Sequence, residues 1–249
     1  MSTLTVGQRR DLRDLLVQAG LIVAAFGVLI WWLLTTDLTE VESSTLAPGA
    51  VWSLTVEHLL LTVISAAIVL AVAIPLGILL TRPALRRAAG PVMAVANIGQ
   101  AAPAVGIIVL FGFWLGFGLQ AAIAALVVYA LLPVLRNTMV GLTQVDRQLI
   151  EAGRGMGMSA AAVLFRVELP LAVPVMLSGI RTALVLLVGT ATLATFVNGG
   201  GLGLLITTGV TLDLTRVLIA GAILVALLAL VVDWTGRVVE LAVRPKGLA

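Results

Sequence analysis

Few residues in this 249-residue chain could carry bond-making chemistry. His58 is the single histidine and the chain has no cysteine, so a zinc site lacks its usual set of ligands. A hydrolytic pair of His58 with Ser178 would need both side chains within hydrogen-bonding reach. The two residues are predicted to lie at opposite ends of their apolar segments. The sequence therefore favours no enzyme activity in this chain.

Nucleotide binding is also poorly supported by the sequence. The chain contains no G-x-x-x-x-G-K-[ST] loop, which is the usual cradle for nucleotide phosphates. Gly153, Gly155 and Gly157 alternate, but no strand precedes them, as a dinucleotide site would require. We therefore expect no cofactor or metal ion bound by this chain.

The composition is that of a protein embedded in a bilayer. Hydrophobic residues make up 61% of the chain and charged residues 11%, against about 45–50% and about 25% in soluble domains. The apolar residues form continuous runs near the ~20 residues that span a bilayer, so helices are predicted and not a barrel. Basic residues sit in short loops, where they set topology, so no nucleic-acid partner is expected.

Six apolar runs are predicted to cross the membrane as helices. They are Leu15–Leu34, His58–Leu80, Pro91–Trp114, Leu119–Leu135, Leu171–Phe196 and Leu214–Val232. All Lys and Arg residues except Arg181 and Arg216 fall on one side of this arrangement, whereas the loop Thr35–Glu57 is acidic. The positive-inside bias then places both termini in the cytoplasm.

Three parts follow from this topology. Residues 1–56 form an N-terminal tail, the first span and an acidic outer loop. Residues 57–236 form the main transmembrane domain, and residues 237–249 form a cytoplasmic tail.

The longest cytoplasmic interruption is Glu151–Pro170. A helix is predicted to break at Gly155–Gly157, because glycine is a poor helix former and tolerates turn geometry. Ser159 can cap a new short helix, and Pro170 can open the next span at its first turn. These features fit either a docking surface for another protein or an ordinary loop on the membrane surface.

The source of energy separates two classes of transporter. Self-powered carriers usually place ionisable residues inside the membrane. No predicted span centre holds Asp or Glu, and Arg181 is the one candidate for a buried charge. This favours energy supplied by another subunit. A stand-alone secondary carrier stays open, because backbone carbonyls alone can coordinate sodium.

The cytoplasmic segment resembles the EAA signature of permease subunits in ATP-driven (ABC) importers. The matching residues are Glu151, Ala152, Gly157, Val167, Leu169 and Pro170. Gly153 departs from the family's alanine at the third position. The stretches Tyr129–Leu142, Glu151–Ser159, Val167–Ala183 and Gly189–Gly203 resemble the osmoprotectant branch, which imports glycine betaine, choline, carnitine and related quaternary amines.

The resemblance covers roughly His58 to Trp234 and implies a type I ABC importer transmembrane fold in a bacterial cytoplasmic membrane. It implies that this segment is a coupling helix held in a cleft of an ATPase subunit, which binds ATP and Mg. Glu151 and Arg154 would supply polar contacts, Gly157 the bend, and Ala160–Phe165 the apolar filling. A second permease copy or a paralogue would complete the membrane part.

Several polar or conformationally special residues are candidates for the translocation pathway or its gate. They are Gln100, Pro103, Asn137, Arg181, Asn198, Gly200 and Gly201. Polar residues in spans often only join helices, and a proline kink often only fits its neighbours. Arg181 either faces the bundle interior or extends toward the inner interface.

Recognition of a quaternary ammonium usually needs an aromatic cage. This chain has one tyrosine, and its five tryptophans fall at the predicted span ends. The specific site is therefore predicted on a separate extracytoplasmic binding protein. Another small solute, such as an amino acid or a sulfonate, is the alternative cargo.

Overall fold

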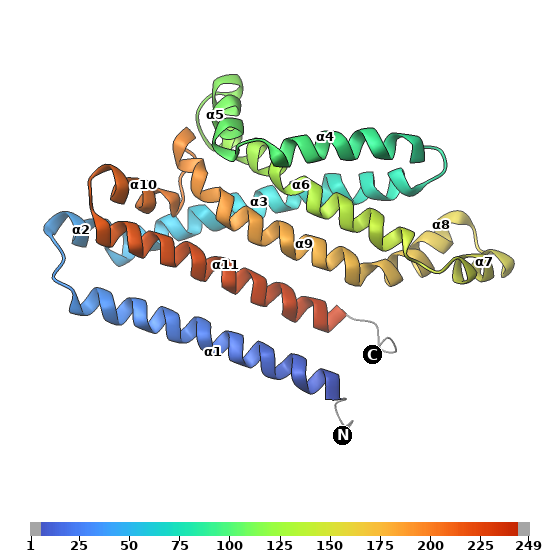
Figure 1. The fold of residues 1–249 in the computed structure, drawn as a ribbon, viewed down its shortest axis with the longest axis horizontal. Helices are drawn as coiled ribbons and strands as arrows, with labels where there is room; N and C mark the ends of the chain where they lie inside the picture. The colour runs from blue at the N-terminus through green and yellow to red at the C-terminus, as the bar shows by residue number, and fades with distance from the viewer. Residues whose placement is uncertain (1–5, 244–249) are drawn as a thin grey trace.

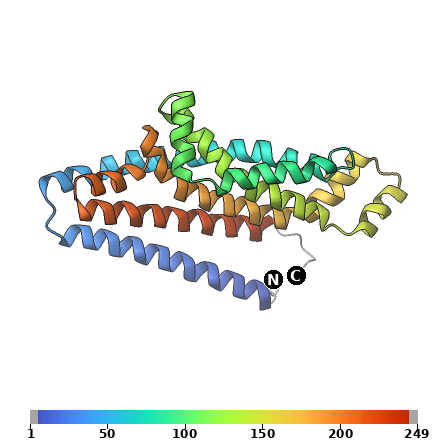
Figure 2. The ribbon, with the colours of Figure 1, turned by 45° about the horizontal axis from the view of Figure 1, so that its top comes forward.

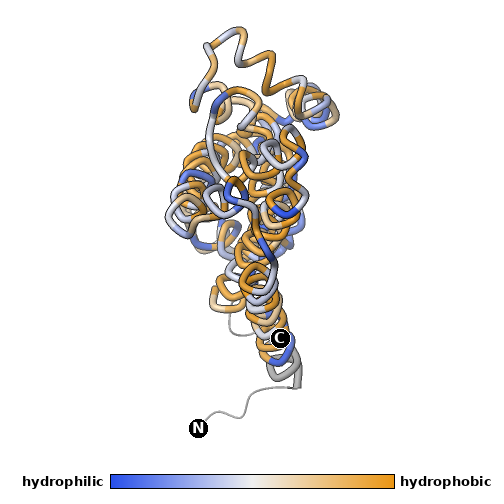
Figure 3. Tube along the Cα trace, turned by 90° about the vertical axis from the view of Figure 1, so that its left-hand side faces the viewer, coloured by the Kyte–Doolittle hydropathy of each residue, from blue (hydrophilic) through white to orange (hydrophobic). Residues whose placement is uncertain are grey.

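The computed structural model describes residues 6–243, with side chains from Leu12 onward. Its five long apolar helices are α1 (Val6–Thr35), α3 (Pro48–Thr81), α6 (Leu119–Thr143), α9 (Leu169–Ala191) and α11 (Thr215–Val243). At 1.5 Å per residue, each is long enough to cross a hydrocarbon core of about 30 Å. The described residues contain no strand, and hydrophobic residues predominate along the helices (Figure 3).

The predicted span Pro91–Trp114 is wrong as a single straight helix. α4 (Ala89–Ala101) and α5 (Ala104–Leu115) meet at an angle of 99°, and α5 stands out from the bundle (Figures 1 and 2). Pro103 lacks a backbone N–H and disfavours helical geometry in the residue before it, and Ala102 is extended with ψ 149°. With this bent pair, up to six spans are present.

Several helix ends differ from the sequence prediction. α1 begins before Leu15, and α3 begins at Pro48 and not at His58. α11 continues past Val232 to Val243, although this last part carries Asp233 and Glu240. Both carboxylates are paired with arginines, which allows the helix to continue through charged sequence.

Short elements close both ends of the bundle. One end holds α2 (Glu40–Thr45), the 3-10 turn η3 (Thr192–Val197) and α10 (Gly203–Thr211). The other holds α7 (Arg147–Gly155), α8 (Ala160–Val163) and the π-helical turn η2 (Leu164–Glu168), and the 3-10 turn η1 (Arg86–Ala88) joins α3 to α4. α1 begins and α11 ends toward the α7–α8 end (Figure 1). Of the predicted C-terminal tail, residues 237–243 belong to α11, whereas residues 244–249 lie outside the described residues, as do residues 1–5 of the N-terminal tail.

The centre of the bundle is α3, α6 and α9, packed closely through small residues. A Cβ on Gly77 of α3 would stand 2.7 Å from Thr138 Cγ2 of α6, and one on Gly179 of α9 would stand 2.8 Å from the Pro133 carbonyl oxygen of α6. Such distances require glycine at both positions. Close backbone approach of this kind is the usual way in which helices associate within lipid.

α1 lies at the edge of the bundle along α11 (Figure 1), and only 6% of its most apolar stretch is buried. Among the side chains that the structure describes, two hydrogen bonds hold it there. Trp234 Nε1 donates to the Leu15 carbonyl at 3.0 Å, and Gln18 Nε2 donates to Asp233 Oδ2 at 3.1 Å.

Candidate functional site: an inner docking segment and an outer glycine loop

Residues Arg147–Glu168, named here the docking segment, project from one end of the bundle (Figure 1). Asp146 caps α7 by accepting from the Gln148 N–H at 2.8 Å. α7 ends at Gly155, and Gly157 follows two residues later with a φ of +81°, which favours glycine. Ser159 accepts from the Ala162 N–H at 3.2 Å and starts α8. The predicted glycine break and serine cap are confirmed.

The signature residues divide into an exposed and a buried set. Those exposed to the surroundings are Glu151, Ala152, Arg154, Gly157 and Pro170, whereas Gly153 is buried and Val167 and Leu169 are half-buried. The predicted apolar filling is also divided: Phe165 is 66% exposed, but Val163 is 1% exposed and packs inward. Met156, 74% exposed, joins Phe165 on the outside. The segment thus exposes two large apolar side chains as well as a carboxylate and a guanidinium.

The docking segment rests on a base cluster of Leu142, Val145, Ala172 and Met176. Ile74 and Ile78 of α3 pack against this cluster, as do Leu164 and Leu169 on either side of Glu168. Three long helices therefore meet the segment at its base. α6 and α9 also continue into it through the chain, but α3 does not.

A partly buried ion pair joins the end of α3 to the docking segment. The Glu168 side chain is 6% exposed and accepts from both terminal nitrogens of Arg82, with Nη1 at 3.1 Å from Oε1. Arg82 is the C-cap of α3, and its Nε donates to the Ile78 carbonyl at 3.3 Å. One guanidinium thus donates to a carboxylate and to a carbonyl at the C-terminal end of α3, which also accepts from Thr81 Oγ1. Both the carboxylate and the helix end favour a positive charge there.

At the opposite end of the bundle, Asn198–Gly203 forms a turn, named here the outer glycine loop after the side of the membrane predicted for it from the sequence. Asn198 is left-handed at φ +58°, and Gly200 and Gly201 have φ +80° and +88°. The Gly201 N–H donates to Glu57 Oε2 of α3 at 3.1 Å. A Cβ on Gly200 would stand 2.6 Å from that carboxylate oxygen. The loop is therefore pressed onto α3 and needs glycine there.

His58 lies beneath this loop and serves packing between helices. A ring nitrogen, Nε2, is 2.9 Å from the Val188 carbonyl of α9, and the side chain is fully buried. Ser178 lies ten residues earlier on α9, about 15 Å away along that helix, so a hydrolytic pair with His58 cannot form. Within the described side chains, no three His, Asp or Glu residues gather to hold a metal ion.

Gln100 and Pro103 lie at the break between α4 and α5. The Tyr129 hydroxyl of α6 donates to the Ala102 carbonyl at 2.8 Å, and Gln100 Nε2 donates to the Tyr129 carbonyl at 3.4 Å. Tyr129 thereby satisfies a carbonyl that the break leaves without a helical partner. These contacts fix the bend between α4 and α5.

Asn137 and Arg181 have partners in neighbouring parts of the bundle. Asn137 Nδ2 donates to the Pro133 carbonyl at 2.9 Å, and its side chain lies against Gly179. Arg181 Nη1 lies 3.0 Å from Glu240 Oε2, and its Nε lies 3.4 Å from Asp233 Oδ1, both on α11. Arg181 therefore faces α11 and binds its carboxylates.

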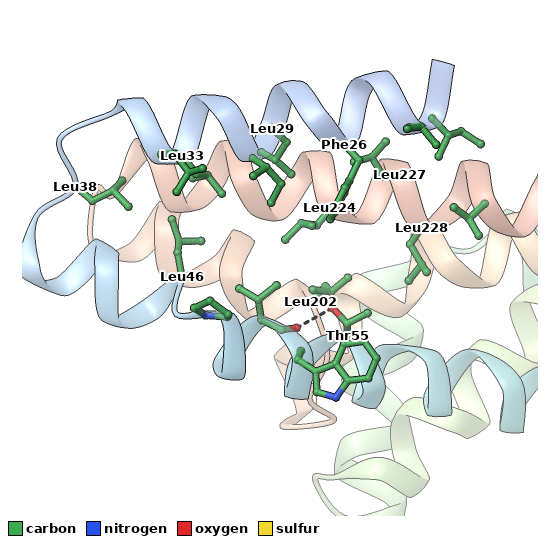
Figure 4. Close-up of a pocket in the computed structure, with 18 residues that line it drawn as sticks. Phe26, Leu29, Leu33, Leu38, Leu46, Thr55, Leu202, Leu224, Leu227 and Leu228 are labelled. Carbon is green, nitrogen blue, oxygen red and sulfur yellow. Dashed lines mark hydrogen bonds between the residues drawn. The ribbon is translucent and has the colours of Figure 1, made fainter. Parts of the chain in front are cut away.

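An apolar groove of about 700 Å³ separates α1 from the outer parts of α3 and α11. Phe26, Leu29 and Leu224 point into it (Figure 4). The Thr55 hydroxyl lines the groove but donates to the Val51 carbonyl at 2.7 Å, so its proton is already used in a hydrogen bond. Apart from the Trp52 indole N–H, the lining side chains offer a hydrophilic solute no free hydrogen-bonding group, so the groove is unsuited to carry one.

The predicted residues thus gather at two ends of the bundle. The signature residues lie together at the inner end, and Asn198, Gly200 and Gly201 lie together at the outer end. The other four candidates lie between the ends and are not brought together: Gln100, Pro103, Asn137 and Arg181. Sequence reasoning missed Glu57, Arg82 and Glu168. Their pairings join residues 144 and 86 positions apart, and no local spacing records them. The one signal was an acidic residue between Val167 and Leu169, where the flanking residues are apolar.

Comparisons with known proteins agree with this arrangement. Residues 73–245 match the family described as binding-protein-dependent transport system inner membrane component. The glycine betaine/carnitine/choline transport system permease protein OpuCB of Bacillus subtilis is 43% identical over 77% of this chain and 88% of its own length. The osmoprotectant import permease protein OsmW of Salmonella typhimurium is 38% identical over 80% and 94%. Among solved structures, a chain of the inward-facing methionine ABC transporter MetNI superposes with a TM-score of 0.68 at 28% identity, covering 83% of this chain and 99% of that one.

Proposed function

Because the chain belongs to the family of binding-protein-dependent transport system inner membrane components, we propose that it is the membrane-spanning subunit of an ATP-driven importer of quaternary-amine solutes. Glycine betaine, choline and carnitine are the solutes in the names of relatives at about 40% identity. A cargo shared with these relatives is favoured over an amino acid, because the methionine transporter chain is only 28% identical.

The docking segment carries the proposal for coupling to an ATPase. It exposes Met156 and Phe165 together with Glu151 and Arg154 in one short segment at the end of the bundle. Apolar anchors with nearby charges are typical of residues that dominate protein–protein binding. The partner ATPase binds and hydrolyses ATP with Mg, and its closure moves the docking segments of two permease subunits. The chain itself holds no nucleotide.

The remaining partners follow from the same proposal. A second copy or a paralogue completes the pathway across the bacterial cytoplasmic membrane, with both chain ends in the cytoplasm. An extracytoplasmic binding protein selects the amine and delivers it to the outer end. The seven candidate pathway residues named from the sequence stay assigned to the pathway or its gate as a proposal, with Arg181 the weakest member because α11 carboxylates occupy it.

Co-purification with the partner ATPase tests the docking role. Glu151→Arg with Gly157→Val is expected to reduce the recovered ATPase by roughly tenfold, as loss of a central contact does. Glu40→Arg, on the exposed outer helix α2, is the matched charge reversal and should leave recovery unchanged. Equal recovery in all variants contradicts docking through this segment.

Uptake by proteoliposomes tests the cargo. Glycine betaine, choline and carnitine should enter only with the ATPase, ATP and binding protein present, whereas methionine should not. Saturable uptake by the chain alone would instead support a secondary carrier. Saturable uptake without the binding protein would place the recognition site on this chain.

A further inference from the structure

α3 is the one long helix that touches both the docking segment and the outer glycine loop through polar side chains. Arg82 holds Glu168 at its inner end, and Glu57 holds the Gly201 N–H at its outer end. The two contacts are 25 residues apart on α3, about 37 Å of helix. We propose that α3 transmits the movement of the docking segment to the outer glycine loop, with Arg82 and Glu168 as the positioning residues at the driven end.

The covalent path explains why such a contact is needed. α6 and α9 continue into the docking segment, so they follow its movement through the chain. α3 is covalently joined only through α2 at one end and through η1 and α4 at the other, and it otherwise packs along α6 and α9. Among the described side chains, the Arg82–Glu168 pair supplies all hydrogen bonds between α3 and the docking segment. The apolar contacts of Ile74 and Ile78 with the base cluster support it.

The geometry of the pair suits the transfer of force. Arg82 is held on α3 itself, since its Nε binds the Ile78 carbonyl while its terminal nitrogens bind Glu168. The bidentate arrangement fixes direction as well as distance. Glu168 closes the π-helical turn that joins the docking segment to α9, and such turns often occur at functional sites. A shift of this turn therefore pulls on the end of α3.

The outer contact converts that shift into a change at the loop. Glu57 accepts directly from the loop backbone, and His58 beside it packs against Gly201, where a Cβ would stand 3.1 Å from Nδ1. Glycines at positive φ allow the loop to lie so close to α3. A displacement of α3 must therefore move the loop or break the Glu57 contact. This inference rests on the proposed function, because it requires an ATPase at the docking segment.

The absence of cysteine allows a single-site reporter. Leu204, directly after the loop and 46% exposed, is changed to cysteine and labelled with an environment-sensitive fluorophore. The complete transporter is reconstituted in liposomes and given ATP and vanadate. Arg82→Gln and Glu168→Gln should each reduce the nucleotide-dependent fluorescence change by about tenfold, while the ATPase still co-purifies. The matched control is Arg87→Gln, an exposed arginine just beyond α3.

Further variants separate transmission from a general loss of packing. Arg82→Glu combined with Glu168→Arg should restore the signal to within about twofold of wild type. Glu57→Gln should reduce the signal, and Glu57→Gln with Glu168→Gln should be no worse than the stronger single variant, since both interrupt one path.

Four results overturn the inference. They are a full signal in Glu168→Gln, additive losses in the double variant, an unresponsive wild-type reporter with the ATPase bound, and a reversed pair that stays silent although it is inserted and binds ATPase. Failure of the wild-type chain to bind an ATPase subunit would instead refute the proposed function.

Discussion

The side chain of Val163 lies against the backbone of Gly153, so that a Cβ built on Gly153 would stand 3.5 Å from Val163 Cγ2. The neighbouring Met158 sulfur would be 3.4 Å away, which is ordinary van der Waals contact. Alanine therefore fits this helical position. We expect Gly153→Ala to raise the free energy of unfolding by about 0.5–1 kcal/mol and to retain the ATPase. Thermal unfolding in detergent and co-purification measure the two effects.

Gly157→Ala is the matched control in the same segment. Its φ of +81° is unfavourable for alanine, so the substitution should cost about 1–2 kcal/mol. A destabilised Gly153→Ala protein would contradict the packing of α7 on Val163.

The crossing of α6 and α9 gives a second prediction. Gly179→Ala would place a methyl group against the Pro133 carbonyl and Asn137, and should lower the free energy of unfolding by about 1–3 kcal/mol through overpacking. Gly189, on the same helix with no atom within 4 Å of its virtual Cβ, should accept alanine. Melting temperatures of the two variants test this, and equal values would refute the close crossing.

Arg181 is predicted to stabilise the packing of α9 against α11 and to have no effect on the affinity for the solute. Arg181→Gln should cost about 0.5–1 kcal/mol, because the ion pairs are a quarter to a third exposed and screened by solvent. The KM for the transported amine should not change. A double-mutant cycle with Glu240→Gln should show coupling, and exposed Arg136→Gln is the control. A changed solute preference in Arg181→Gln would contradict this prediction and support a role for Arg181 in the translocation pathway.

The attachment of α2 should depend on pH. Hydrogen bonding to the backbone of Thr39, and then to Arg216, lowers the pKa of Glu42 below its ordinary value of 4.5, despite the opposing effect of burial. The charged form is therefore favoured in the folded protein, and its stabilising effect is present above the unfolded pKa and lost as pH falls through the folded one. The melting-temperature difference between wild type and Glu42→Gln should shrink below about pH 4. A constant difference from pH 7 to 3 would contradict this.

The sequence was sufficient for the features that depend on local chemistry. Apolar run length predicted the spanning helices. The types of Gly157 and Ser159 predicted the turn and the cap within the docking segment, and Pro170 predicted the start of α9. Each depends on one residue and its immediate neighbours. Pro103 marked a possible bend in the sequence. The 99° angle could not be predicted, because the bend leaves the Ala102 carbonyl to be bound by Tyr129 of another helix.

The long-range partners could not be predicted in this way. The sixth span was predicted to end at Val232, whereas α11 continues through Asp233 and Glu240, which pair with Arg181 of α9. Glu57 suggested only an acidic loop, and Arg82 only a topology signal. Each acquires its role from a residue on another helix, and the pairing depends on how three helices cross.

The position of α1 also bears on how the protein is made. Its two side-chain hydrogen bonds reach α11 residues more than 200 positions later in the chain, whereas α3, α6 and α9 pack on one another without it. During synthesis α1 is therefore the first described helix to enter the membrane and the last to find its neighbour. Until α11 is inserted it must remain as a lone helix in lipid, tethered to a core that is already assembling.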